Sequence, residues 1–338
     1  MQFTLRGFLK GIIIAGLLCM AVFLGLRHFG YIGRPENDDP ISLAREAREA
    51  LAAVRARRPG QSRPPSYDMV LAPLDKLLAQ ARELVQSGSF NPVTDYDLVV
   101  RLTAPVMEVA RLADAQAKLE TGYLTKEYRF NDQFGEASLY LATTLWERIN
   151  ALQPKNLGYL DDPVPLPEND MKRLRDILDA GINAAPDSRD LHYLRGIVNR
   201  ADGLFAPAAK DLERAVEIDS SYAAAWNTLG LVRIPLREFD KAEEALERAR
   251  ALALLEAEKF KVEPGEEYTA IVYNLASFHE GLAAFYERES RLNPTVENQR
   301  LLKKHAADAR KHLEEFLSRE PSGTPDAREA RAKLDALP

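Results

Sequence analysis

Three histidines in the last fifth of the chain have the residue type and spacing that a metal or proton-transfer site needs. His305 and His312 are seven residues apart, so they share one face of a helix, and His279-Glu280 lies one predicted helix earlier. Imidazole binds transition metals and exchanges protons near neutral pH. The residues around the pair are charged: Lys303, Lys304, Arg310 and Lys311. We therefore expect a charged, solvated helix face here, with no metal site.

The sequence holds no other pattern that is typical of catalysis. It has no glycine-rich phosphate loop, no His-Glu-x-x-His motif and no Gly-x-Ser-x-Gly motif. The carboxylate pairs Asp161-Asp162 and Glu266-Glu267 lie in charged stretches with nothing nearby to raise a pKa. The single cysteine, Cys19, permits neither an intrachain disulfide nor a thiolate metal cluster. We predict no catalytic residue, no cofactor and no metal, and hence no enzyme.

The elements that would position these residues are helices. Alanine, leucine, arginine and glutamate dominate the 338 residues, and β-branched residues rarely cluster beyond the N-terminus, which predicts an all-α fold. Only four of the 45 basic residues precede Glu36, so 41 basic residues face 51 acidic ones in the rest of the chain. This acidic balance argues against nucleic acid as a partner.

Part of the chain repeats itself with a period of 34 residues. Leu212-Glu213-Arg214-Ala215 returns as Leu246-Glu247-Arg248-Ala249. Further pairs keep the same spacing: Gly196 and Gly230, Phe205 and Phe239, and Ala208 and Ala242. A fixed period of about 34 with small residues at the helix crossings is typical of a helix-turn-helix solenoid.

On these residues the stretch resembles two tetratricopeptide (TPR) repeats. The second carries Trp226-x2-Leu229-Gly230 and Ala242-x3-Leu246, whereas the first keeps only Gly196 and Ala208-x3-Leu212. Both lack the closing proline of the family, at Ser220 and Leu254. The resemblance implies a TPR-like superhelix whose concave groove binds protein segments. By position in the first helices, the implied groove residues are Tyr193, Ile197, Arg200, Asn227, Leu231 and Asn274.

The same register predicts four regions. Residues 1–34 are a transmembrane anchor, 35–66 a linker with a stalk helix, 67–152 an N-terminal helical region, and 153–338 TPR-like repeats closed by a capping helix at Thr324 to Leu337. Pro105 either kinks or divides the helix predicted from Tyr96 to Leu119. The aromatic and arginine-containing segment Gly122 to Gly135 is either a binding hot spot or an element packed on the domain edge. The proline-rich stretch Gln153 to Pro167 is predicted to be a loop.

The N-terminal anchor prediction depends on one apolar run. Residues 11–26 carry no charge, and with flanking aromatic residues the stretch 8–32 can span a bilayer as one helix. A cleaved signal peptide, a lipoprotein signal and a buried helix are the alternatives. Arg6 and Lys10 precede the run, while Arg27 and Arg34 follow it. We predict a single-pass protein of the inner (cytoplasmic) membrane with its C-terminal body in the periplasm.

Together these features predict a membrane-anchored TPR scaffold or adaptor in a bacterial envelope complex. Its partners would be membrane or exported proteins, and the lipid bilayer through residues 8–32. One alternative is a structural subunit of a large membrane complex, such as secretion, pilus or respiratory assembly machinery. Another is a ligand-binding or enzymatic domain in Tyr67 to Leu152.

Overall fold

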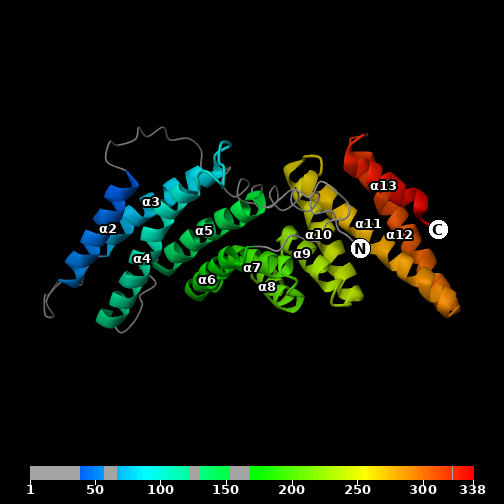
Figure 1. The fold of residues 1–338 in the computed structure, drawn as a ribbon, viewed down its shortest axis with the longest axis horizontal. Helices are drawn as coiled ribbons and strands as arrows, with labels where there is room; N and C mark the ends of the chain where they lie inside the picture. Colours follow the sequence, from blue (N-terminus) through cyan, green and yellow to red (C-terminus); the bar gives the residue numbers. More distant parts are fainter. Residues whose placement is uncertain (1–38, 57–66, 122–129, 153–166, 322) are drawn as a thin grey trace. The chain divides into compact units, whose positions relative to one another are not determined.

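The structure is a computed structural model that describes residues 39–56, 67–121, 130–152, 167–321 and 323–338. Within these ranges all regular secondary structure is α-helical, as predicted (Figure 1). The predicted anchor, most of the loop at Gln153 to Pro167 and the first part of Gly122 to Gly135 lie outside the described residues. None of the described helices has the length and apolar character needed to cross a bilayer. By its internal contacts the chain divides into two compact units, one ending at Asp202 and the other continuing from Gly203.

The unit that ends at Asp202 contains six described helices. They are α2 (Pro40–Arg55), α3 (Asp68–Gln86), α4 (Tyr96–Thr121), α5 (Phe130–Leu152), α6 (Glu168–Ala184) and α7 (Arg189–Ala201). Helix α4 runs through Pro105 without a break, so this proline does not divide it. Asp39 begins α2 by accepting hydrogen bonds from the backbone N–H groups of Ile41 and Ser42, with Pro40 in the first turn.

Helix α2 differs from the isolated stalk helix that the sequence predicts. It packs against α3 and α4 and buries the apolar stripe formed by Leu43, Ala47, Leu51 and Val54. That stripe looked thin because two of its four positions are alanine or valine. Small side chains nevertheless let neighbouring helices approach, and burial of the stripe ties α2 to the body of this unit.

Polar and aromatic contacts join α3 to α5 in the same unit. The Arg82 guanidinium donates from Nε to the Tyr140 hydroxyl at 2.9 Å and forms an ion pair with Glu136. Phe130, which belongs to the aromatic segment singled out in the sequence, is fully buried and packs edge-on against Tyr67. The described part of that segment, from Phe130 onward, thus packs inside the unit rather than presenting a loop.

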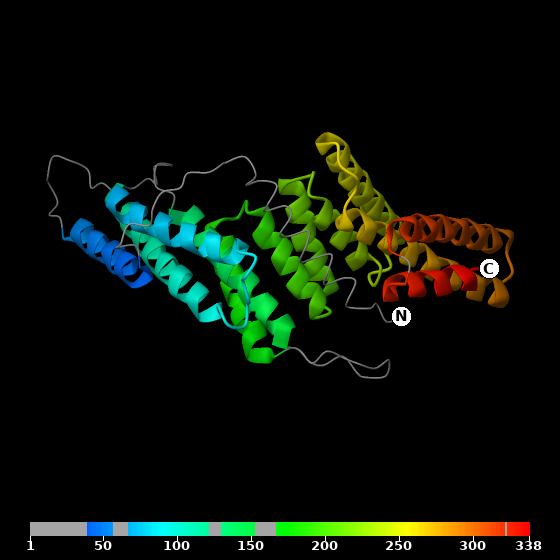
Figure 2. The ribbon, with the colours of Figure 1, turned by 90° about the horizontal axis from the view of Figure 1, so that it is seen from above.

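The unit that starts at Gly203 also contains six described helices (Figures 1 and 2). They are α8 (Phe205–Ile218), α9 (Ala223–Arg233), α10 (Phe239–Phe260), α11 (Glu266–Leu292), α12 (Val296–Arg319) and α13 (Pro325–Ala336). Helices α7 and α9 begin 34 residues apart, and so do α8 and α10. The period in the sequence is therefore a period of helix starts.

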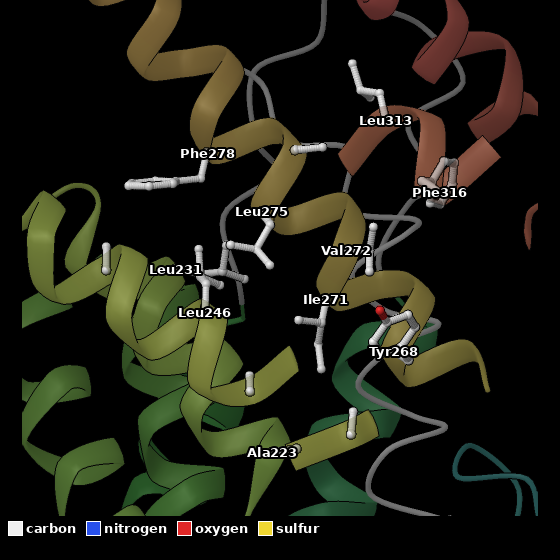
Figure 3. Packing of buried hydrophobic residues seen from close by; sticks show 14 of the residues in the cluster. Ala223, Leu231, Leu246, Tyr268, Ile271, Val272, Leu275, Phe278, Leu313 and Phe316 are labelled. Atoms are coloured by element: carbon white, nitrogen blue, oxygen red, sulfur yellow. The ribbon is translucent and has the colours of Figure 1, made fainter. Parts of the chain in front are cut away.

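The repeated positions form the helix crossings. Ala208 and Ala242, Leu212 and Leu246, and Ala215 and Ala249 are all fully buried. A Cβ atom added to Gly230 of α9 would lie 2.6 Å from Leu246 Cγ of α10, so only glycine permits this approach. Leu246 continues into a core that joins α9, α10, α11 and α12 through Leu231, Ile271, Leu275 and Leu313 (Figure 3).

Helices α11 and α12 are the longest neighbours of this unit, and α13 packs on α12. The side chain of Thr295 caps α12, and that of Thr324 caps α13 with Pro325 in its first turn. Ala327 and Ala330 bury one face of α13, while Arg328, Arg331 and Asp335 are exposed. This polar outer face is the one the sequence predicts for a capping helix.

Candidate functional site

Three of the six predicted groove residues are buried. Tyr193 and Leu231 are each 6% exposed and Ile197 is 3% exposed. Leu231 lies in the core beside Leu246 and Leu275 (Figure 3). The prediction placed these side chains by their position in the repeat alone, but α7 and α9 bury apolar residues around most of their circumference. In this structure the three side chains stabilise the fold and are not available to a partner.

The other three predicted residues are partly exposed. Asn227 of α9 and Asn274 of α11 are brought together, with the Asn274 Nδ2 donating to the Asn227 Oδ1 at 3.0 Å. Arg200 lies on α7 in the unit that ends at Asp202, and its side chain is half-buried. The structure therefore joins two members of the predicted set, the carboxamides of α9 and α11, which we call the asparagine pair.

A second cluster lies between α11 and α12. His279 of α11 and His305 and His312 of α12 are only 2%, 4% and 2% exposed. The His279 Nδ1 and His305 Nδ1 atoms are 3.1 Å apart, so that one imidazole donates and the other accepts. The His279 ring stacks on His312 with ring centroids 5.7 Å apart, and Tyr286 stacks on the far side of His305. We call His279, His305 and His312 the histidine cluster.

Burial keeps the histidine cluster neutral. It lowers the pKa of His279 to about 3, and the charges of His305, His312, Lys304 and Lys311 lower it further. Burial also lowers the pKa of His305 and of His312. All three rings are therefore uncharged imidazoles at neutral pH, the form that binds metal ions.

These positions correct the expectation of a solvated face. The charged neighbours Lys303, Lys304, Arg310 and Lys311 are indeed exposed, but the histidines lie on the opposite side of α12. There they continue an apolar stripe with Ala309, Leu313 and Phe316. The signal was present in the sequence, because positions 305, 309, 312, 313 and 316 share one helix face. The immediate sequence neighbours of a histidine do not show which face it occupies.

One carboxylate also differs from its expectation. Glu267, at the start of α11, is half-buried, and burial raises its pKa to about 7, with a further contribution from the charge of Glu256 on α10. The charged sequence around Glu266-Glu267 hid this, because the approach of α10 is a tertiary contact. Nothing in the described surroundings of Glu267 positions a nucleophile or a substrate.

Comparison with known proteins gives fold neighbours and no family. No family matches the sequence, and no curated protein does either. Among solved structures, the chain is similar to MamA, with 18% identity over 63% of this chain and 93% of that one, and a TM-score of 0.32. It is also similar to yeast Tom70, with 15% identity over 95% of this chain and 69% of that one, and a TM-score of 0.30.

A monomeric mutant of IFIT1 matches over 88% of this chain with 15% identity and a TM-score of 0.42, and the chain spans about half (55%) of that protein. These neighbours are helical-repeat proteins of the TPR type. Because all three scores are low, we derive the function from the contacts of this chain itself. Those contacts show an all-helical protein with a 34-residue repeat of helix starts.

Proposed function

We propose that this protein is a membrane-anchored scaffold of the TPR type that binds other proteins in a bacterial envelope complex and catalyses no reaction. The asparagine pair is the observation that supports binding most directly. The first helices of two successive helix pairs, α9 and α11, place carboxamides side by side at partly exposed positions. Both residues were predicted to line the protein-binding groove.

The chemistry of the pair suits a peptide. Their mutual hydrogen bond uses one Asn274 N–H and the Asn227 carbonyl oxygen. Within the described part of the chain no other side-chain hydrogen bond involves them, so the Asn227 amide group and the Asn274 carbonyl oxygen stay available. A peptide group carries one N–H donor and one C=O acceptor, which matches what the pair offers.

The membrane part of the proposal is supported by the sequence. Residues 8–32 would cross the inner membrane once and place the body in the periplasm, where membrane or exported proteins would be the partners. A scaffold held at the membrane meets such partners at a high effective concentration, which strengthens otherwise modest contacts.

Purification of the full-length protein from its own membranes tests the binding function. A C-terminal affinity tag and mild detergent would be used, and the co-purifying chains would be identified and counted. The proposal predicts membrane or exported proteins in a constant molar ratio. If the protein purifies alone, with only trace and varying companions, the scaffold proposal is wrong.

Cysteine labelling tests the anchor and its orientation. Replacing the only cysteine, Cys19, by serine and the exposed Ser318 by cysteine gives a chain with one reporter thiol in α12. A membrane-impermeant maleimide applied to cells with a permeabilised outer membrane should label this thiol, and the protein should stay in the membrane pellet at high pH. Labelling only after lysis would place the body in the cytoplasm, and release from the pellet would exclude an uncleaved anchor.

A further inference from the structure

The histidine cluster carries an inference that is independent of the scaffold proposal. Two of its nitrogens, His279 Nδ1 and His305 Nδ1, approach one another to 3.1 Å between α11 and α12. Asp308 follows His305 by three residues on α12, so its carboxylate lies on the same side of the helix. One ligand atom from each of His279, His305 and Asp308 can be chosen so that all three lie within 4.8 Å of one another.

We propose that His279, His305 and Asp308 form a binding site for a divalent transition-metal cation, of which zinc is the type. A tetrahedral zinc ion has Zn–N bonds of about 2.0–2.1 Å, which puts two nitrogen ligands about 3.3 Å apart. The two Nδ1 atoms are within a few tenths of an ångström of that separation. Asp308 is half-exposed, so its carboxylate has room to rotate toward the ion.

The ligand types select the class of cation. Two imidazoles and one carboxylate suit zinc and neighbouring transition metals, whereas magnesium and calcium prefer oxygen ligands throughout. Three protein ligands leave the fourth position of a tetrahedral ion to water or to a group from a partner. Because Asp308 is the exposed edge of the site, that fourth position faces outward.

The stacked rings give the site rigid walls. Tyr286 lies parallel to His305 with an interplanar angle of 5°, and His312 lies parallel to His279 with an angle of 7°. Stacking fixes the orientation of the two ligating rings before an ion binds, which lowers the ordering cost of binding. His312 is a wall rather than a ligand, because its ring lies face to face with His279 and its nitrogens do not belong to the set of converging ligand atoms.

A plain hydrogen bond between the two Nδ1 atoms is the competing explanation for their short distance. It needs no ion, and Asp308 would play no part in it. The two explanations differ in their response to added zinc. An ion that joins α11 to α12 binds the folded state and therefore raises the melting temperature, whereas a simple hydrogen bond gives no such response.

Zinc titration of the full-length protein in detergent tests the proposal. All forms would carry Cys19→Ser, so that the single thiol cannot contribute. Isothermal titration calorimetry with zinc should give one ion per chain, the melting temperature should rise by several degrees, and a chelator should reverse the shift. Cobalt should give the visible absorption of a four-coordinate site. Absence of stoichiometric binding would overturn the proposal.

Three matched phenylalanine variants identify the ligands. His279→Phe and His305→Phe keep an aromatic ring but remove the ligand nitrogen, so zinc affinity should fall at least about 100-fold. His312→Phe makes the same change at the wall and should leave the affinity within about threefold of its starting value. Equal loss in all three variants, or loss in His312→Phe alone, would contradict the assigned ligand set.

A fourth variant guards against misfolding of the buried substitutions. Asp308→Asn changes a half-exposed side chain and should leave the helical content unchanged. It removes the carboxylate charge, so zinc affinity should fall at least about tenfold. Unchanged affinity in this folded variant would exclude Asp308 as a ligand and overturn the three-residue site.

Discussion

The α9/α10 pair and the α11/α12 pair are successive antiparallel helix pairs of one unit, but their interfaces differ in chemistry (Figure 1). The first crosses at Gly230 against Leu246, where there is no space for one additional carbon. The second is built from longer helices and buries three imidazoles beside its aliphatic core. The pair that keeps the regular repeat length thus depends on small residues, and the longer pair has room for polar groups.

The largest expected effect is at the crossing of the regular pair. Leu246→Ala removes a fully buried side chain that contacts α9 and the shared core. We expect a loss of about 3 kcal/mol in the free energy of unfolding, measured by chemical denaturation. Leu255→Ala is the control, because Leu255 lies on the same helix with 58% of its surface exposed, and it should change stability by less than about 0.5 kcal/mol. Similar losses in both variants would mean that Leu246 does not close the crossing.

The next effect adds an atom to the same contact. Gly230→Ala places a Cβ 2.6 Å from Leu246 Cγ and 3.1 Å from the Ala242 carbonyl oxygen, which we expect to destabilise the protein by about 2 kcal/mol. Gly88→Ala meets no atom within 4 Å and should be nearly neutral. In Gly230→Ala/Leu246→Ala the new methyl group occupies part of the space left by leucine, so the combined loss should be smaller than the sum. Strict additivity would contradict direct contact.

A smaller, pH-dependent effect belongs to the start of α11. The pKa of Glu267 is raised to about 7 in the folded protein, so between its unfolded pKa near 4.5 and pH 7 the folded state binds more protons than the unfolded state. Stability is therefore lost as the pH rises through this window. Glu267→Gln mimics the protonated side chain and should stabilise the protein by about 1–2 kcal/mol at pH 8, but not at pH 4. A difference that is independent of pH would contradict the raised pKa.

The smallest expected stability effect is that of the asparagine pair. Asn274→Ala removes one hydrogen bond between partly exposed amides and should cost about 0.5–1 kcal/mol. Thermal unfolding of this variant and of Asn227→Ala should give nearly equal shifts, because each change removes the same bond. A loss above about 2 kcal/mol would make the pair part of the core rather than a contact surface.

Much of this fold was predictable from local sequence signals. The 34-residue period located the starts of α7 to α10 because glycine and alanine must recur wherever helices cross closely. Capping residues such as Asp39, Thr295 and Thr324 located helix starts for the same kind of local reason. What was predicted less well depends on tertiary contacts. The packing of α2 on α3 and α4 is one such case, and the raised pKa of Glu267 is another.

The candidate site divides in the same way. Asn227 and Asn274 were predicted as groove residues, and the structure places them together, although their role in binding remains a prediction. Tyr193, Ile197 and Leu231 were chosen by repeat position, which does not distinguish a groove from a core on helices buried around most of their circumference. The histidine cluster was judged by its charged sequence neighbours, whereas the stripe through His305, Ala309 and Leu313 would have predicted burial.

The most direct test of the proposed scaffold compares partner recovery between two variants of the full-length protein. Asn227→Ala/Asn274→Ala removes both carboxamides of the pair, and Gln299→Ala removes one exposed carboxamide from α12 as the control. Both variants should stay folded. We predict that the double variant recovers at least about tenfold less of the co-purifying proteins than the control does. Equal recovery from both variants would contradict binding at the asparagine pair.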